Sequence, residues 1–502
     1  MKHSLKYILP ILSFATIFVV TSCDKKLDDL SPHNVNFEDQ QFLTPNGYAK
    51  ATIGNYTYLS GTSSTTAYES YWFNLSEFRG NNVKFIDITS TNSFQAAQDV
   101  DAFNFTNSAS KDFSYTHAFW LASYRALLGI NMVLKHIQDG ETNAIILQAK
   151  AENLFLRAVV NFNLVRLYGK PYYQNPETNP GVPLILAPIT STANPPARAT
   201  VKATYDQIIK DLTDAIAAFK QRKVNSFADK YGAFAMLSRV YLYMSGTFAQ
   251  PNAPNAQLAK QYADSVLSNG GYVLLQGTAY SNYYTNSNQN NTETIWAMNN
   301  DAVQSFIPRM LMQPAGPYAG STQYSTGQAK PSPDFLSLIA PNDLRKNYYL
   351  RDKYPNNNID TLSCMKYVYK YVNTGVYYSN APVHYLRLAE IYLNRAEAKV
   401  KLGDNTGALA DLNVIHTRAG LLPLAGLSGQ ALFDAILAER RLELAFEGHN
   451  SYDYFRNGLA MVRSYSSFNS APITINVTDP KVVMRISQDV LAENPNVVQN
   501  NQ

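Results

Sequence analysis

Charged side chains with helical spacing are the first residues in the sequence that could do chemistry. Arg440 and Glu443 are three residues apart, and Glu443 and Glu447 are four apart, so one helical face would carry both signs. Glu390 and Glu397 lie two turns apart on another such segment. A glycosidase needs two carboxyl groups about 5 to 9.5 Å apart across a cleft, but residues typical of helix packing surround both groups. We therefore expect ion pairs that join helices at these positions, and not catalysis.

Local signatures of enzymes are absent from the sequence. It contains no G-x-S-x-G, H-E-x-x-H, P-loop, G-x-G-x-x-G or C-x-x-C pattern. Its seven histidines are scattered, and no two of those after His3 have a metal-ligand spacing of three or four residues. We expect a protein that is not an enzyme and that has no cofactor and no metal site. Structural calcium held by loop carbonyls and Asp side chains stays open, because it has no spacing signature here.

Composition favours an uncharged polar ligand. Charged residues make up 16% of the chain, against about 25% in typical proteins, and there are 35 Tyr. The net charge of +4 is spread out, which argues against nucleic-acid binding. A sugar ring has an apolar C–H face and a hydroxyl rim, so its site needs an exposed aromatic ring with polar side chains beside it. Three groups meet this need: Tyr68, Tyr71 and Trp72 followed by Asn81 and Asn82; Tyr283 and Tyr284; and Tyr318 and Tyr324.

Each of these aromatic residues has an alternative interpretation. A tyrosine is often packed in the interior with only its hydroxyl exposed, and this alternative stands beside ligand binding for every ring in the three groups. Trp120 and Trp296 lie in apolar, periodic surroundings, and we expect both in the core. Trp72 is therefore the tryptophan that we expect to act as an exposed platform.

Helical periodicity defines the elements that must position these residues. Apolar residues at i, i+3 and i+4 predict helices over 45–59, 117–128, 145–168, 204–220, 230–245, 255–269, 383–402, 405–419, 429–447 and 452–462. Residues 60–107 lack a sustained period and predict loops with short strands. Residues 270–378 are of mixed character, and we expect short strands, brief helices and ordered loops there.

Several predicted helices form antiparallel pairs of similar size. The clearest pair spans 385–419, with Gly403 and Asp404 at the turn, as in a tetratricopeptide repeat. Residues 149–168 with 205–219, and 230–243 with 256–267, form two more. Three such pairs can bury a continuous core. The predicted fold is mainly α, with tetratricopeptide-like helix pairs as the scaffold and a loop-rich, short-strand region for the ligand.

The N-terminus has the layout of a secretory signal peptide. Lys2 and Lys6 precede an apolar run over 7–20, which is shorter than the about 20 residues of a membrane-spanning helix. Its end at Cys23 resembles the lipobox of bacterial lipoproteins, which implies removal of 1–22 and a lipid on Cys23. The alternative is an ordinary signal peptide with a chance cysteine. Cys364 is the other cysteine, so lipidation of Cys23 leaves no internal disulfide.

Five segments in order resemble the SusD/RagB family. They are the opening Cys23 with Asp24 to Pro32, the Trp120-x-x-x-Tyr124 helix with Asn131, the segment Tyr385 to Ala398, the segment Ile436 to His449, and Arg485 to Asn500 at the end. The match implies one SusD-like domain over 23–502, with a tether at 23–32, an N-terminal part at 33–270 and a C-terminal part at 271–502. Asn450 and Ser451 depart from the Arg and aromatic residue that usually follow the Gly-His pair in this family.

The resemblance implies a function. Family members are outer-membrane lipoproteins that face the cell exterior, bind glycans without covalent chemistry, and close as lids over a SusC-like, TonB-dependent transporter. This implies an oligosaccharide ligand, a membrane contact through the lipid, and a barrel partner. Two alternatives stay open: a RagB-type protein that binds peptides for import, and a helical-repeat interaction scaffold without a small ligand.

Overall fold

The computed structural model describes residues 38–60, 68–85, 97–106, 115–189, 195–284, 290–298, 316–317, 324–325, 329–349, 351–352, 361–362, 370–371, 377–378, 382–467 and 470–500. The leader at 1–22, Cys23, the tether at 23–32, Tyr318 and Cys364 lie outside these residues. Within the described ranges, no helix has both the length and the apolar character that a membrane crossing requires.

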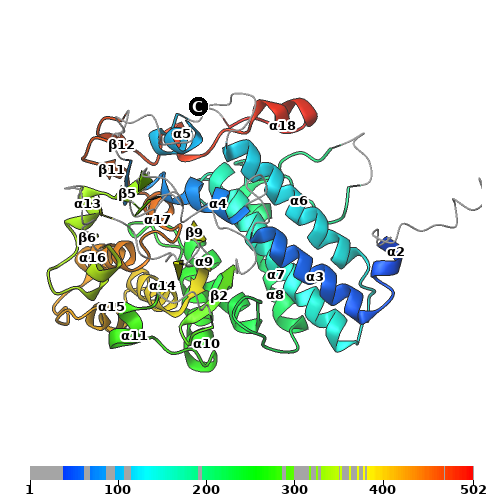
Figure 1. Cartoon of the computed structure of the whole chain (residues 1–502), viewed down its shortest axis with the longest axis horizontal. Helices are drawn as coiled ribbons and strands as arrows, with labels where there is room; N and C mark the ends of the chain where they lie inside the picture. The colour runs from blue at the N-terminus through cyan, green and yellow to red at the C-terminus, as the bar shows by residue number, and fades with distance from the viewer. Residues whose placement is uncertain are drawn as a thin grey trace, which may run out of the picture.

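Three helix pairs form the scaffold, as predicted. α7 (Ala144–Tyr168) packs with α8 (Val201–Ala218), α9 (Lys230–Met244) with α10 (Ala253–Asn269), and α14 (Leu388–Lys401) with α15 (Asn405–Arg418). Successive pairs stack through α8 on α9 and α10 on α14, and α16 (Gly429–Glu443) covers α14 and α15 (Figure 1). This stacking buries one face of each pair against the next and produces a continuous core.

Side-chain caps set the beginnings of these helices. Asn143 Oδ1 accepts a hydrogen bond from Ile145 N at the start of α7 (2.9 Å), and Asp404 Oδ1 accepts one from Gly407 N at the start of α15 (2.8 Å). Each cap satisfies a backbone donor that the first helical turn leaves unpaired. Gly403, between α14 and α15, has φ +82°, a conformation that favours glycine, so the tight turn predicted here is confirmed.

The N-terminal helices cover the outer side of the first pair. α3 (Pro45–Leu59) and α6 (Tyr115–Lys135) pack on α7, and α4 (Tyr68–Glu77) packs on α6 (Figure 1). α2 (Glu38–Gln41) precedes α3, and α5 (Ala97–Asn104) lies beside α4. The expectation of loops with short strands over 60–107 is wrong for α4 and α5, although β1 (Val83–Phe85) confirms one short strand. Buried polar residues in α4 hide its apolar period.

Short antiparallel strand pairs connect the helices. β2 (Thr294–Met298) pairs with β10 (Val383–Arg387), β1 with β5 (Ala329–Pro331), and β11 (Met461–Arg463) with β12 (Ile473–Ile475). The predicted helices over 383–402 and 452–462 are therefore partly wrong, because the first begins as β10 and the second, α17 (Asn450–Arg456), gives way to β11. Three two-residue pairs are β3 (Gly316–Pro317) with β4 (Tyr324–Ser325), β6 (Arg351–Asp352) with β7 (Thr361–Leu362), and β8 (Lys370–Tyr371) with β9 (Tyr377–Tyr378).

Brief helices complete the described chain and confirm the mixed character expected for 270–378. They are α11 (Gly277–Ser281), α13 (Pro333–Leu336) and the 3₁₀ helix η1 (Leu344–Tyr349). The C-terminal segment holds a second 3₁₀ helix, η2 (Pro480–Val482), and α18 (Gln488–Glu493).

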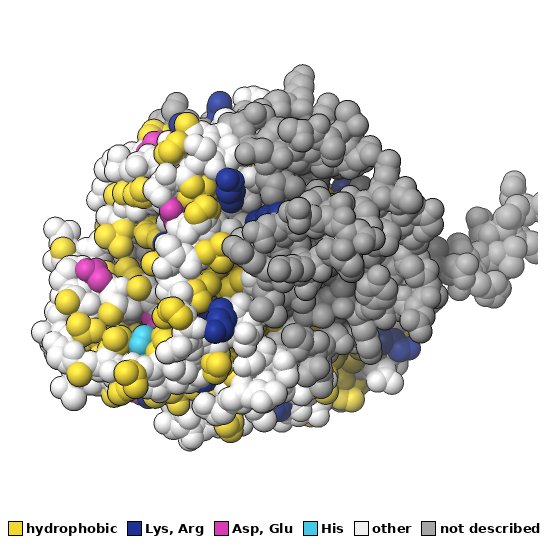
Figure 2. Space-filling view, turned by 60° about the vertical axis from the view of Figure 1, so that its left-hand side comes forward, with side chains coloured by type: hydrophobic (Ala, Val, Ile, Leu, Met, Phe, Trp, Pro, Cys, Tyr) yellow, Lys and Arg dark blue, Asp and Glu magenta, His cyan; other side chains and the backbone are white. Residues whose placement is uncertain are grey.

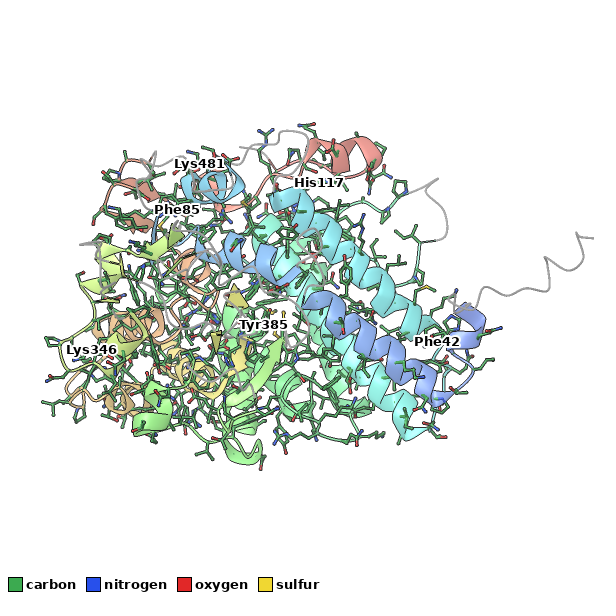
Figure 3. All side chains as sticks on the ribbon, in the orientation of Figure 1. Phe42, Phe85, His117, Lys346, Tyr385 and Lys481 are labelled. Carbon is green, nitrogen blue, oxygen red and sulfur yellow. The ribbon has the colours of Figure 1, made fainter. Side chains whose placement is uncertain are left out.

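Tyr385 lies at the centre of the main core. Its ring centroid is 5.0 Å from that of Trp72 and 5.2 Å from that of Trp296, and its hydroxyl donates to Asn163 Oδ1 at 2.8 Å. Figure 3 places Tyr385 between the long N-terminal helices and the C-terminal half. Trp296 and Trp120 are 1% and 6% exposed, which confirms both as core residues. A single strand residue thus joins α4, α7 and β2.

Buried tyrosines predict a sharp loss of stability at alkaline pH. Burial raises the pKa of Tyr56, Tyr68, Tyr124, Tyr280 and Tyr284 well above 10.0. The unfolded chain loses these protons near pH ~10 and the folded chain keeps them, so the free energy of unfolding falls as pH rises above ~10. We expect the tyrosinate absorbance to increase together with the loss of the helical circular-dichroism signal.

Lys401 has the opposite effect over a lower pH range. Burial lowers its pKa to about 8 despite the nearby Glu397, so its proton is lost from the folded chain first. Its contribution to the free energy of unfolding therefore rises between pH about 8 and the ordinary lysine pKa of about 10.4. Because five tyrosines outweigh one lysine, the net decline should still begin near pH ~10. Gradual tyrosinate formation with an unchanged helical circular-dichroism signal would contradict the prediction from the buried tyrosines.

Candidate functional site

The first predicted aromatic platform lies in the interior. Tyr68 is fully buried and Trp72 is 2% exposed, because both point from α4 toward the core. The indole of Trp72 packs on Tyr385, and a Cβ added to Gly448 would lie 2.7 Å from Trp72 Cζ2. Tyr71, on another side of α4, is half-buried. The expectation of an exposed platform at Trp72 is wrong, because this side chain fills the space between α4 and the C-terminal half.

The two asparagines after α4 are also buried, and they bind the C-terminal part. Asn81 N donates to Asn450 Oδ1 at 2.7 Å, and Asn81 Nδ2 donates to Val462 O at 2.9 Å. Asn82 Oδ1 accepts from Arg441 Nε at 2.9 Å. Asn450, one of the two departures from the family pattern, therefore has a structural partner here. These contacts join segments that are more than 350 residues apart in the sequence.

The second predicted platform is part of the polar interior. Tyr283 and Tyr284 are 4% and 5% exposed. The hydroxyls of Tyr283 and Thr294 lie 2.7 Å apart, and Tyr284 donates to Glu447 Oε1 at 2.7 Å. Both tyrosines follow the alternative interpretation, and even their hydroxyls are covered. In the third group, Tyr324 belongs to β4, while Tyr318 lies outside the described residues.

The charged face of α16 forms buried ion pairs, as predicted. Arg345 Nη1 lies 2.6 Å from Glu439 Oε1, and Arg387 lies 2.6 Å from carboxylate oxygens of both Glu443 and Glu447. All five side chains are at most 4% exposed. Burial alone would raise the pKa of Glu443, but the neighbouring arginine charges outweigh it and hold that pKa well below its ordinary value.

The second pair of candidate carboxylates is divided between two separate ion pairs. Glu390 Oε2 lies 2.6 Å from Arg239 Nη2, and Glu397 Oε1 lies 2.6 Å from Arg456 Nη1. Both glutamates are at most 1% exposed. Burial alone would raise the pKa of Glu397, but the charge of Arg456 and then that of Lys401 outweigh it and hold that pKa well below its ordinary value. The carboxyl group of Glu397, held in this way, cannot serve as a proton donor near neutral pH. The buried ion pairs of both glutamates confirm the structural interpretation.

A cavity of about 240 Å³ lies between α16 and α17, and we call it the α16–α17 cavity. Arg441, His449, Asn450 and Asp453 line it together with Asn82. Leucine side chains and Tyr454 form apolar parts of its wall. The cavity combines a few polar groups with apolar surface, which is the usual make-up of a small-ligand site. The described residues contain no cluster of three or more His, Cys, Asp or Glu that could hold a metal ion.

The sequence contains no local pattern that predicts this cavity. Arg441 and His449 belong to the segment Ile436 to His449, for which the sequence predicts ion pairs and a family resemblance but no ligand site. The mixed charge of that segment was correctly attributed to ion pairs, but Arg441 makes none with any described residue. The one signal for a ligand site is that Arg441 has no ion-pair partner among the described residues, whereas Arg440 has one. The sequence does not reveal this difference, because it does not show which carboxylates lie near each arginine.

The stacked helix pairs define a mainly helical protein built on tetratricopeptide-like pairs. Within that class, the SusD family model matches residues 203–502, and the chain belongs to the SusD family. A second family model, described as starch-binding associating with outer membrane, matches residues 53–242. This family is known for glycan binding at the cell surface, and its members are binding proteins, not enzymes.

Individual relatives are similar over most of the chain. A SusD-like protein from Formosa agariphila is 23% identical over 395 residues, covering 68% of this chain and 70% of that protein. The crystal structure of a SusD superfamily protein from Bacteroides thetaiotaomicron has a TM-score of 0.76 and 26% identity, and covers 92% of this chain and 100% of that one. A SusD-like carbohydrate binding protein from Bacteroides vulgatus shares the fold, with a TM-score of 0.72 and 21% identity over 90% of this chain and 97% of that one.

Proposed function

We propose that this protein is a cell-surface lipoprotein that binds oligosaccharides without covalent chemistry and delivers them to a SusC-like, TonB-dependent transporter. The lipid would be carried by Cys23 at the outer face of the outer membrane. The observation that carries this proposal is the agreement of fold with a SusD superfamily protein over 92% of the chain.

The surface supports an uncharged ligand. In the described part of the face shown in Figure 2, charged side chains are few and are scattered among apolar and uncharged polar ones. Such a surface can stack against sugar rings and bind hydroxyls without removing water from many charges. The buried carboxylates described above are held in ion pairs and leave the glycan intact. Capture followed by closure on the barrel is then sufficient for delivery.

Calorimetric titration with a panel of oligosaccharides tests this function. We expect at least one glycan to bind, and we expect Tyr71→Ala, Tyr318→Ala or Tyr324→Ala to weaken its binding by about two- to tenfold, the range of a single aromatic contact. Trp72→Phe is the matched control, because a buried ring should leave the affinity unchanged.

Isolation of the protein from outer membranes separates the alternatives. A co-purifying β-barrel partner agrees with delivery to a transporter. Binding of peptides but of no glycan would show that the ligand class is wrong, and soluble protein partners alone would favour a scaffold.

A further inference from the structure

The α16–α17 cavity has an unbalanced charge at one end. Arg440 and Asp453 both line it, but Arg440 Nε lies 3.1 Å from Asp453 Oδ2, and Asp453 Oδ1 also lies 2.6 Å from Arg456 Nη2. Arg456 also lies 2.6 Å from Glu397, so Arg440 and Arg456 both have anionic partners. Arg441 instead donates from Nε to Asn82 Oδ1 at 2.9 Å and from Nη2 to Asn81 O at 3.2 Å. Both acceptors are uncharged, so the guanidinium of Arg441 lines the cavity without an anionic partner among the described residues.

Two neighbouring side chains leave hydrogen-bonding groups unused. His449 lines the cavity and is 5% exposed, and its Nδ1 has no hydrogen-bond partner among the described residues. Burial lowers the pKa of His449 well below 6.5, and nearby arginines add to this effect, so the ring is neutral. Asn450 accepts a hydrogen bond from Asn81 N through its Oδ1, so the carbonyl of its amide points to the protein and its Nδ2 is the unused group. A buried polar atom without a partner costs about 1 to 3 kcal/mol, and a ligand that reaches it removes this cost.

The far end of the cavity has the opposite character. Asp434 lies seven residues before Arg441 on α16, which corresponds to about 10 Å along a helix axis. It is exposed and accepts a hydrogen bond from Gln430 Nε2 at 2.7 Å. A carboxylate is a strong acceptor for sugar hydroxyls and repels an anion. The two ends of the cavity therefore define the direction in which an anionic sugar would lie.

The size and the wall of the cavity suit one sugar ring. A cavity of about 150 Å³ holds benzene, so 240 Å³ is sufficient for a six-membered ring with its substituents and too small for a chain. Leu437, Leu444 and Leu459 supply the apolar surface that the C–H face of a ring needs. We propose that the α16–α17 cavity binds a single uronate residue of a glycan, with its carboxylate on Arg441 and its hydroxyls toward Asp434. This inference rests on the proposed glycan-binding function and adds to it: the weakly charged outer surface suits the neutral part of a glycan, and this cavity suits one acidic residue of it.

Saturation-transfer NMR and calorimetry with free monosaccharides test the inference. The probes are sodium D-glucuronate, sodium D-galacturonate, D-glucose and L-glutamine. We expect one of the uronates to bind and D-glucose to bind at least about tenfold more weakly, because glucose has no carboxylate for a charge-assisted contact to arginine. L-glutamine has a carboxylate but no ring for the leucine wall, and should also bind at least about tenfold more weakly. Arg441→Gln should weaken uronate binding by about tenfold or more. Lys50→Gln is the matched control, because Lys50 is an exposed cation on α3 and should leave uronate binding unchanged.

A second variant blocks the cavity without removing an interior side chain. Ala438 lines the rim and is exposed, so Ala438→Trp should fold normally, as circular dichroism can verify, and abolish uronate binding. Binding of no uronate, equal binding of D-glucose, tighter binding of L-glutamine, or unchanged uronate affinity in either cavity variant overturns the inference. If Ala438→Trp still binds the neutral oligosaccharides of the panel, the proposed function stands without this site. If the wild-type protein binds no glycan of the panel, the proposed function itself fails.

Discussion

Replacement of Arg387 with Met is expected to lower the free energy of unfolding by about 3 to 5 kcal/mol at neutral pH, the cost of removing one partner from a buried ion pair. Arg387 contacts Glu293, Glu443 and Glu447, with its Nη1 at 3.2 Å from Glu293 Oε1 and 2.6 Å from Glu443 Oε1. Its Nη2 also donates to the backbone oxygen of Glu443 at 2.6 Å. The substitution leaves these carboxylates in the interior with less positive charge around them. Urea denaturation measures the loss.

The loss should be smaller in acid. In the wild-type protein the neighbouring arginines outweigh burial and hold the pKa of Glu443 well below 4.5, so its contribution to stability is present above that pH and lost as pH falls. In the variant the same carboxyl takes up a proton more easily, which removes part of the uncompensated charge. The difference between the two proteins should therefore shrink as pH falls from neutrality toward about 4.5.

Two further variants control this experiment. Lys210→Met breaks an exposed pair, in which the side chains of Lys210 and Asp214 are 66% and 45% exposed, and should cost less than about 0.5 kcal/mol. Arg387→Lys keeps the charge but loses the planar fork, so we expect an intermediate loss. Equal small losses for Arg387→Met and Lys210→Met would show that the buried network contributes nothing beyond an ordinary surface pair.

Local patterns were sufficient to predict the repeat scaffold. The α14 and α15 pair follows from apolar spacing, a glycine and a capping Asp404, all within a few residues of the turn. The same patterns fail for β10, where five successive residues are buried and merge with the start of α14. A continuous apolar run cannot be assigned to strand or helix by its period. Only the pairing with β2, distant in the sequence, decides it.

The site was harder to predict because its contacts are between distant segments. The spacing of Glu443 and Glu447 predicts ion pairs, which the structure confirms, yet Arg345 lies 98 residues from Glu443 in the sequence and no spacing rule connects them. In α4, Glu69 and Glu77 are as buried as Trp72, so the helix has no polar face that would reveal which side is exposed. The polar residues of this stretch predict a loop, and aromatic residues in a loop predict an exposed ligand site. The wrong expectation at Trp72 therefore comes from the helix α4 that the sequence pattern does not reveal.

Trp72→Ala is therefore expected to change stability and not binding. Removing a buried tryptophan leaves a cavity beside Tyr385 and Gly448, and such substitutions cost about 3 to 5 kcal/mol. Trp72→Phe should cost less, because it keeps a ring against Tyr385. It also removes the indole Nε1, which is buried and has no hydrogen-bond partner among the described residues, so the lost N–H costs nothing. Urea denaturation of the two variants measures both effects.

The contrast between stability and affinity decides what Trp72 does. A platform residue would lose glycan affinity in Trp72→Phe and Trp72→Ala while leaving the unfolding midpoint nearly unchanged. A core residue gives the reverse, a large shift of the midpoint in Trp72→Ala and wild-type affinity in the folded Trp72→Phe protein. Tyr71→Ala is the matched comparison on the same helix, because its half-buried ring supports less of the core and should shift the midpoint less. We expect the second pattern, because the Trp72 side chain on α4 is buried against Tyr385 of β10. The residue that most resembled a sugar platform then stabilises the contact between α4 and the C-terminal half.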